Sequence, residues 1–317
     1  MFANFFRHLR RSIYQYIGWL IVTVFLITAC HNQVPLSPKA STGCRIVDTA
    51  IGETCVPTHP QRVVALDLLD NVLALGIKPV GATVYEGHFL TSLPAEKSAD
   101  IQSVGMSGQP DIESILQLKP DLILNTYGGR SNYKQLSQIA PVVLAGDGGG
   151  IDWQGWLKTY GAALGKQAEA DAMIDEYCQR VAEFRQQMSG RLSQTQISVV
   201  MSWGGYRTYM NKSFSGQILR DIGLPRPPLQ DQDKVNENIS LELIPRMEGD
   251  VIFLMVGGNE PSILEKLLNH PLWSQLKAVQ EGRVYQVDAN AWLAGYGPVG
   301  ANVVLDDLFR YLIYEWE

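Results

Sequence analysis

The sequence predicts an α/β protein with two open, mostly parallel-sheet lobes, joined by one long helix and separated by a ligand cleft. Three observations predict this fold class. The chain has 317 residues, which is long for a single hydrophobic core. Strand and helix signals alternate in both halves, as they do in parallel sheets covered by helices. Between the halves, residues 166–189 carry apolar side chains at offsets of three, four and seven, the spacing of one helix face.

The segment 166–189 is interpreted as a strut between the lobes. At about 1.5 Å per residue its helix would be roughly 35 Å long, about the width of a small domain. On its polar side, Glu176 precedes Arg180 by four residues, the favourable order for a helical ion pair. Periodicity alone leaves an alternative open, which is a long surface helix within one domain.

The other signals divide the chain into five parts. These are a signal peptide at 1–29, a lipidated tether at 30–43, an N-terminal α/β lobe at 44–152, a helical linker at 153–189, and a C-terminal α/β lobe at 190–317.

Turn and cap residues set the expected elements of each lobe. In the first lobe we expect strands at 62–66, 77–83, 122–124 and 142–145, and helices at 71–75, 112–117, 132–139 and 153–164. In the second lobe we expect strands at 197–201, 251–256 and 283–287, and helices at 215–222, 241–247, 262–268, 272–279 and 302–314. The two sheets would each place their ligand-binding edge at the carboxyl ends of the strands.

The N-terminus is typical of an exported protein. Arg7, Arg10 and Arg11 precede an apolar run at 13–29, which ends in small residues before Cys30. This arrangement resembles a bacterial lipobox, which implies cleavage before Cys30 and lipidation of its thiol. A single uncleaved membrane anchor is the alternative.

The charge argues against nucleic-acid binding. The full chain carries a net charge of −6. Removal of residues 1–29 takes away three arginines and no acid, which leaves 23 basic against 32 acidic residues, a net charge of −9. A surface this acidic would repel phosphate backbones.

Three cysteines remain after Cys30. Cys44 directly precedes a short predicted strand, 45–47, and Cys55 lies in another, 54–56. An exported protein meets oxidising conditions. A disulfide between them is expected, although the sequence leaves the bond open. Cys178 lies in the long helix and is expected to be a buried, inert thiol.

Several short motifs resemble those of a known family in their order and spacing. They are Thr54-Cys-Val-Pro, Pro60-Gln-Arg-Val-Val, Gly108-Gln-Pro-Asp-Ile-Glu, Leu118-Lys-Pro-Asp-Leu-Ile, Asn269-His-Pro-Leu-Trp, Gly282-Arg-Val-Tyr and Asp306-Asp-Leu. The chain from Cys44 onward is similar to the helical-backbone (class III) iron–siderophore and cobalamin substrate-binding proteins of ABC importers. The cysteine pair is similar to a branch found in cyanobacteria.

The resemblance implies an extracytoplasmic lipoprotein of iron uptake rather than an enzyme. It implies capture of a ferric siderophore in the cleft and delivery to an ABC permease and its ATPase, by a monomer that faces the periplasm on a lipid anchor. It also implies that Glu113 and Glu242 dock the permease. A helix-dipole role is the structural alternative for both glutamates, because each lies early in a predicted helix.

Candidate ligand contacts follow the predicted strand ends. A bulky, partly apolar, anionic chelate needs aromatic walls and arginines that fork onto oxygens. The residues of these types are Tyr85, Tyr127, Arg130, Trp203, Tyr206, Arg207, Trp292 and Tyr296. A cap on the hydrophobic core is the structural alternative for each aromatic residue.

Other functions have weaker signals. The five histidines have no partners at metal-ligand spacing, so any iron would be held by its chelator and no cofactor is expected. Haem or cobalamin is the alternative cargo, with Tyr206 or Tyr296 as a possible axial haem ligand. An extracytoplasmic serine hydrolase is the third alternative, but the chain lacks the G-x-S-x-G elbow.

Overall fold

The computed structural model describes residues 43–85, 87–89, 93–148, 150–256 and 261–316. Residues 43–317 form one compact unit. The predicted signal peptide, Cys30 and the tether up to residue 42 lie outside the described residues. Within the described ranges, none of the helices combines the length and the apolar character needed to span a bilayer.

The first sheet has six strands in the order β6–β5–β4–β3–β7–β8. All neighbouring strands are parallel except the pair of β5 with β6. The strands are β3 (Val63–Ala65), β4 (Gly81–Val84), β5 (Gln102–Met106), β6 (Gln109–Pro110), β7 (Leu122–Thr126) and β8 (Val142–Ala145). The carboxyl ends of β3, β4, β5 and β7 therefore lie along one edge, the edge at which such sheets bind ligands.

Helices cover both faces of this sheet. They are α2 (Leu69–Ala74), α3 (Ala95–Ser98), α4 (Ile112–Leu118), the 3-10 helix η2 (Tyr127–Asn132), α5 (Tyr133–Leu136) and α6 (Trp153–Leu164). Alternate residues of β7 reach opposite faces: Leu122 and Leu124 join one core cluster, and Ile123 joins another with Ile115 of α4. Burial on both faces explains the continuous apolar run of this strand.

The second sheet has five strands in the order β11–β10–β9–β12–β13. Its strands β9 (Ile197–Met201), β12 (Val251–Val256) and β13 (Val284–Asp288) are parallel, whereas β10 (Tyr206–Tyr209) and β11 (Asn236–Ile239) are antiparallel additions. The predicted bounds of β9, β12 and α6 are confirmed. The antiparallel strands were not predicted, so this sheet is less uniformly parallel than expected.

Helical segments surround the second sheet. They are α8 (Phe214–Ile222), η4 (Leu241–Met247), α9 (Pro261–Leu268), η5 (Trp273–Gln275), α10 (Lys277–Gln280), α11 (Ala289–Ala294), α12 (Pro298–Phe309) and the wider turn η6 (Arg310–Tyr314). The helix expected at 272–279 is broken into η5 and α10, and α11 replaces an expected loop.

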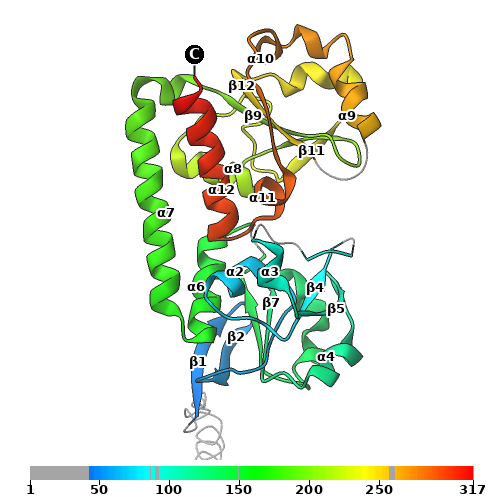
Figure 1. Cartoon of the computed structure of the whole chain (residues 1–317), viewed down its shortest axis with the longest axis vertical. Coiled ribbons are helices and arrows are strands. Elements are labelled where there is room, and N and C mark those ends of the chain that lie inside the picture. Colours follow the sequence, from blue (N-terminus) through cyan, green and yellow to red (C-terminus); the bar gives the residue numbers. More distant parts are fainter. Residues whose placement is uncertain (1–42, 86, 90–92, 149, 257–260, 317) are drawn as a thin grey trace, which may run out of the picture. The chain divides into compact units, whose positions relative to one another are not determined.

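The long helix α7 (Gln167–Met188) joins the two sheets, within one residue of the predicted bounds. It packs against α6 near its N-terminal end and against α8 and α12 further along its length, as Figure 1 shows. Its apolar stripe is buried, and the hydroxyl of Tyr177 donates to Asp221 of α8 at 3.0 Å.

One expectation for α7 was wrong. Arg180 does not pair with Glu176 on the helix surface: its guanidinium donates to Asn302 at 2.5 Å and to Asp306, both on α12. The inter-helix partners fix α12 against α7, because the fork of an arginine can hold two acceptors at once.

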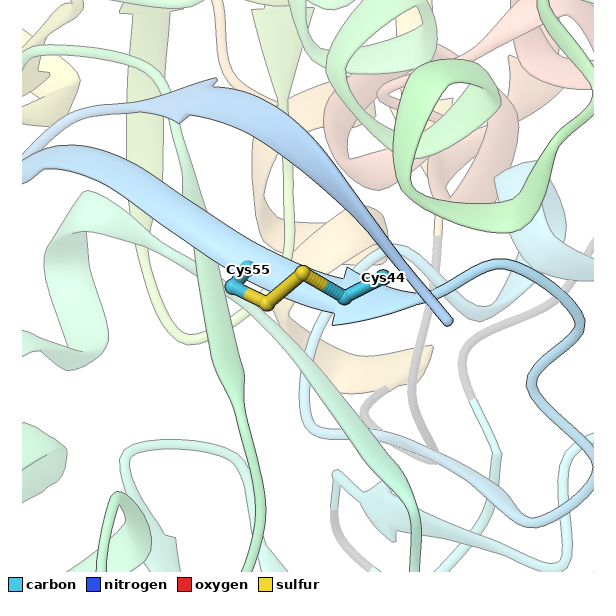
Figure 2. Close-up of a disulfide and its surroundings, with 2 residues drawn as sticks. All are labelled: Cys44 and Cys55. Atoms are coloured by element: carbon cyan, nitrogen blue, oxygen red, sulfur yellow. A yellow bond between two sulfur atoms is a disulfide. The ribbon is translucent and has the colours of Figure 1, made fainter. Parts of the chain in front are cut away.

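A two-stranded hairpin precedes the first sheet. Strands β1 (Cys44–Thr49) and β2 (Gly52–Pro57) are antiparallel, and a disulfide joins Cys44 to Cys55 with 5.6 Å between their Cα atoms (Figure 2). The guanidinium of Arg45 donates to the carbonyl oxygens of Ala162 at 2.6 Å and Thr58 at 2.5 Å, which ties the hairpin to the end of α6. Cys178, expected to be buried, is exposed on α7.

Candidate functional site

A small cavity opens where the carboxyl ends of β3 and β4 face the segment after α11. Its volume is about 170 Å³. The side facing the first sheet includes Ala65, residues 67–71 and residues 83–85, and the other side includes residues 294–296, with Trp156 of α6 between them. The end of α11 and the residues after it therefore meet the first sheet at its predicted ligand-binding edge.

A second cavity of about 230 Å³ shares Asp67, Thr83 and Ser107 with the first. It continues toward the η2 turn, where Gly128 and Gly129 line it. Pockets for drug-sized ligands hold roughly 300–1,000 Å³. Each cavity is thus the size of one arm of a bulky ligand, and Asp67 stands at their junction.

Asp67 lies two residues after the end of β3 and has a partly buried carboxylate. The hydroxyl of Thr126, at the end of β7, donates to Oδ2 at 2.8 Å, and the hydroxyl of Ser107, after β5, donates to Oδ1 at 3.2 Å. Burial raises the pKa of Asp67, and the two hydroxyl donors offset part of that rise. Three parallel strands thus position one carboxylate.

Tyr85 and Trp203 meet across the cleft. Tyr85 follows β4 and Trp203 follows β9, and their rings make an edge-to-face contact with centroids 6.4 Å apart. The guanidinium of Arg207 lies beside them, held by Asn238 Oδ1 at 2.9 Å and the carbonyl of Trp203 at 3.5 Å. Three predicted contacts therefore converge, and the arginine keeps unused donors.

Tyr296 links the two lobes beside this pair. Its ring makes edge-to-face contacts with Trp156 at 5.8 Å and with Phe214 of α8 at 5.7 Å. Its carbonyl accepts a hydrogen bond from Asn71 of α2 at 3.2 Å. Burial, with Tyr209 and Asp67 nearby, raises the pKa of Tyr296 to about 12. Tyr296 lines the first cavity, but most of its contacts hold α2, α6 and α8 together.

Tyr127 and Arg130 lie together on the η2 turn. The Arg130 guanidinium stacks 4.4 Å from the centroid of the Tyr127 ring, which itself packs at Gly148. Arg130 is exposed, and its guanidinium donates to the Tyr127 carbonyl at 3.3 Å. The turn borders the second cavity through its glycines, so Arg130 stands near the cleft without closing it.

Two predicted contacts lie elsewhere. Tyr206 faces the opposite side of its strand, and its hydroxyl donates to the carbonyl of Ile263 in α9 at 2.9 Å. Trp292 is completely buried on α11, stacked on Phe253 at 4.6 Å, and its Nε1 donates to Asp307 at 2.8 Å. The structure does not bring these two side chains to the cavities: the alternation of β10 directs Tyr206 toward α9, and α11 directs Trp292 into the core.

Sequence reasoning missed several cavity residues. They include Asp67, Asn71 and Trp156, to which the sequence analysis gave no role in ligand binding. The available signal was position: Asp67 directly follows the predicted strand 62–66, and Ser107 directly follows β5, which is parallel to β4. Among the residues that the structure describes, no group of His, Cys, Asp and Glu is arranged to hold a metal ion.

Comparisons with known proteins agree with this arrangement. A family model described as "Periplasmic binding protein" matches residues 64–291. The probable siderophore-binding lipoprotein YfiY of Bacillus subtilis is 31% identical over 313 residues, covering 92% of this chain and 96% of the relative. The achromobactin-binding periplasmic protein of Dickeya dadantii is 30% identical over 267 residues, covering 79% of this chain and 86% of the relative.

A solved structure extends the likeness to the fold. The crystal structure of Staphylococcus aureus SirA complexed with staphyloferrin B matches with a TM-score of 0.73 and 29% identity, covering 84% of this chain and 98% of SirA. The two sheets, the long joining helix and the cleft between them are therefore an arrangement that a siderophore-bound protein also has.

Proposed function

The chain belongs to the periplasmic binding protein family, and on that premise we propose that it captures a ferric siderophore in its cleft and delivers it to an ABC-type permease. The observation that carries the proposal is the meeting of Tyr85 and Trp203 beside Arg207. Two rings from different sheets supply apolar walls, and the arginine supplies donors for anionic oxygens. The names of YfiY and the SirA complex support this class of cargo.

The proposed protein is an exported lipoprotein. Residues 1–29 direct export, Cys30 carries the lipid, and 30–43 tether the protein to the membrane. The lobes 44–152 and 190–317 then bind the cargo outside the cytoplasm, with 153–189 as the helical linker. A relative named as a lipoprotein supports this location.

Two exposed glutamates are proposed as the docking contacts. Glu113 lies in the first turn of α4 and Glu242 in the first turn of η4, one on each lobe. A hydrogen bond from Ser240 is the main cause that lowers the pKa of Glu242, so this side chain is anionic at neutral pH. Fixed negative charges on both lobes would suit basic pockets on a permease.

Uptake measurements test the docking contacts. We expect Glu113→Ala and Glu242→Ala to reduce uptake of the iron chelate several-fold while ligand affinity stays normal. Glu176→Ala, an exposed glutamate of α7, is the matched control and should leave uptake unchanged. Normal uptake by the double variant of the docking residues would refute their assignment.

The haem alternative has less support in this geometry. A tyrosinate axial ligand must lose its proton. Tyr206 points away from the cleft, and burial raises the pKa of Tyr296 to about 12, which opposes deprotonation. Any iron in the proposed site is cargo that arrives inside its chelator.

Tryptophan quenching tests the proposed cargo directly, since Trp203 and Trp156 lie at the cleft. The purified chain in detergent is titrated with ferric hydroxamate, ferric catecholate, ferric citrate, haem and cobalamin. We expect submicromolar, saturable quenching by one ferric chelate, weakened at least tenfold in Arg207→Ala. Tight binding of haem or cobalamin alone would overturn the siderophore assignment and retain the family.

A further inference from the structure

The first cavity contains a carboxylate at its junction with the second cavity. Asp67 lines both cavities, and its carboxylate is partly buried. Asn71 also lines the first cavity, but its Nδ2 donates to the Tyr296 carbonyl at 3.2 Å and its buried Oδ1 packs against Gly297. Asp67 is therefore the acceptor with which this cavity favours an occupant that brings N–H groups.

The charges and the aromatic rings that line the first cavity also favour a cationic occupant. None of the described residues that line the cavity is a lysine, arginine or histidine, and no ion pair joins Asp67 to a cation in the described part of the chain. Three rings line the cavity, those of Tyr85, Trp156 and Tyr296. A carboxylate among aromatic faces is the environment that attracts an ammonium group.

The hydroxyl donors leave room for such a group. Each oxygen of Asp67 accepts one hydroxyl, from Ser107 or Thr126, whereas a carboxylate can accept about four hydrogen bonds. The Nε1 of Trp156 sits against Gly146, which lines a different cavity, so this donor does not satisfy Asp67. Burial raises the pKa of Asp67, which is the response of a carboxylate without a neighbouring cation.

We propose that this cavity is a subsite for a protonated amine on the ligand, with Asp67 as its counter-ion. The inference rests on the proposed function for the identity of the whole ligand. With Arg207 on the other wall, it defines the substrate class as a zwitterionic ferric chelate that bears both anionic oxygens and a free amine. A volume of about 170 Å³ fits an aminoalkyl arm and excludes the iron centre.

The first test uses a small probe alone. n-Butylammonium is titrated into the full chain at constant ionic strength, with tryptophan fluorescence as the readout and n-butanol as the neutral probe of the same shape. We expect a saturable response to the ammonium only, reduced at least tenfold in apparent affinity by Asp67→Asn. Asp175→Asn, which removes an exposed carboxylate from α7, is the matched control and should behave as the wild type.

The second test uses matched ferric chelates. Hydroxamate, catecholate and citrate-type chelates are each compared with a free amine and with that amine acetylated. We expect at least a tenfold preference for the amine form, lost in Asp67→Asn. Equal binding of both forms, or no saturable ammonium response, overturns the subsite and leaves siderophore binding intact. A specific ammonium response without binding of any chelate retains the subsite and overturns the proposed cargo.

Discussion

Two strands of the second sheet, β9 and β13, are followed by the same residue types, but their tryptophans differ in burial. After β9 come Trp203, Gly204 and Gly205; after β13 come Trp292 and Gly295. Trp203 remains half-buried at the cleft, where it contacts Tyr85. Trp292 is completely buried against Phe253.

The backbone conformation after each strand causes the difference. Gly204 and Gly205 have φ values of 60° and 117°, the left-handed region that favours glycine, and they turn the chain back into the antiparallel β10. After β13, the carboxylate of Asp288 accepts from the backbone of Asn290 and Ala291 and so caps α11. A glycine turn leaves its tryptophan at the cleft, whereas a capped helix rotates its tryptophan into the core.

The largest expected effect is a difference in protein stability between variants of the two tryptophans. Trp292→Ala should lower the free energy of unfolding by about 3–5 kcal/mol, because it empties a buried ring site and leaves Asp307 without its donor. Urea unfolding followed by circular dichroism measures this loss. Trp203→Ala is the control and should cost about 1 kcal/mol or less. A cost for Trp292→Ala no greater than that of the control would contradict its placement in the core.

The contact between Gly297, which follows α11, and Asn71 of α2 gives the next largest expected effect on stability. A Cβ atom on Gly297 would lie 1.7 Å from Asn71 Oδ1, and Asn71 is completely buried, so its amide has little room to move. Gly297→Ala should therefore cost about 2 kcal/mol of stability by overpacking the contact between α2 and this segment. Gly190→Ala, where an added Cβ meets nothing within 4 Å, is the matched control for thermal unfolding. Equal melting temperatures for the two variants would rule out a tight contact.

The cleft tryptophan should affect binding instead. Trp203→Ala removes one ring of the pair with Tyr85, and we expect affinity for the proposed chelate to fall about tenfold, or about 1.4 kcal/mol. Fluorescence cannot report on the lost tryptophan, so calorimetric titration is the measurement. Trp203→Phe keeps an aromatic face and should recover most of the affinity. An unchanged affinity in Trp203→Ala would place the ligand elsewhere.

Local signals were enough to predict the parallel strands and α7. Continuous apolar runs such as 251–256 and the period of 166–189 report burial directly, so β12 and α7 appear with nearly the expected bounds. The strand β10 was missed because it is only 4 residues long, Tyr206–Tyr209, and one of its two partners, β11, is distant in sequence. Pairing of this kind leaves little trace in a single segment.

The types of residue that line the cleft could be predicted from the sequence, but the positions of those residues could be predicted only in part. Tyr85 and Trp203 converge because each follows a parallel strand, β4 in the first sheet and β9 in the second, and Arg207 lies on β10 next to Trp203. Trp292 was misplaced because the cap at Asp288 was not recognised as a helix start, although an Asp before Ala-Asn-Ala is a typical one. Asn71 escaped notice because its importance comes from a contact with Tyr296, 225 residues away.

The smallest expected effect concerns the hydrogen bond that anchors Trp292. Burial is the main cause that raises the pKa of Asp307, and the indole N–H lowers it, so Trp292→Phe should raise it further. A carboxyl with a raised pKa binds its proton more tightly in the folded state. Its contribution to stability therefore falls as pH rises from about 4, the usual value for aspartate, through the folded pKa.

Trp292→Phe should therefore cost about 1 kcal/mol at pH 7, where the Asp307 carboxylate loses a donor, and less at pH 4, where it becomes protonated. Urea unfolding at intervals between pH 4 and pH 8 measures the deficit relative to the wild type. In an Asp307→Asn background the same substitution should give a deficit that does not change with pH. A pH-independent deficit with Asp307 intact would mean that only ring packing distinguishes this tryptophan from the one at the cleft.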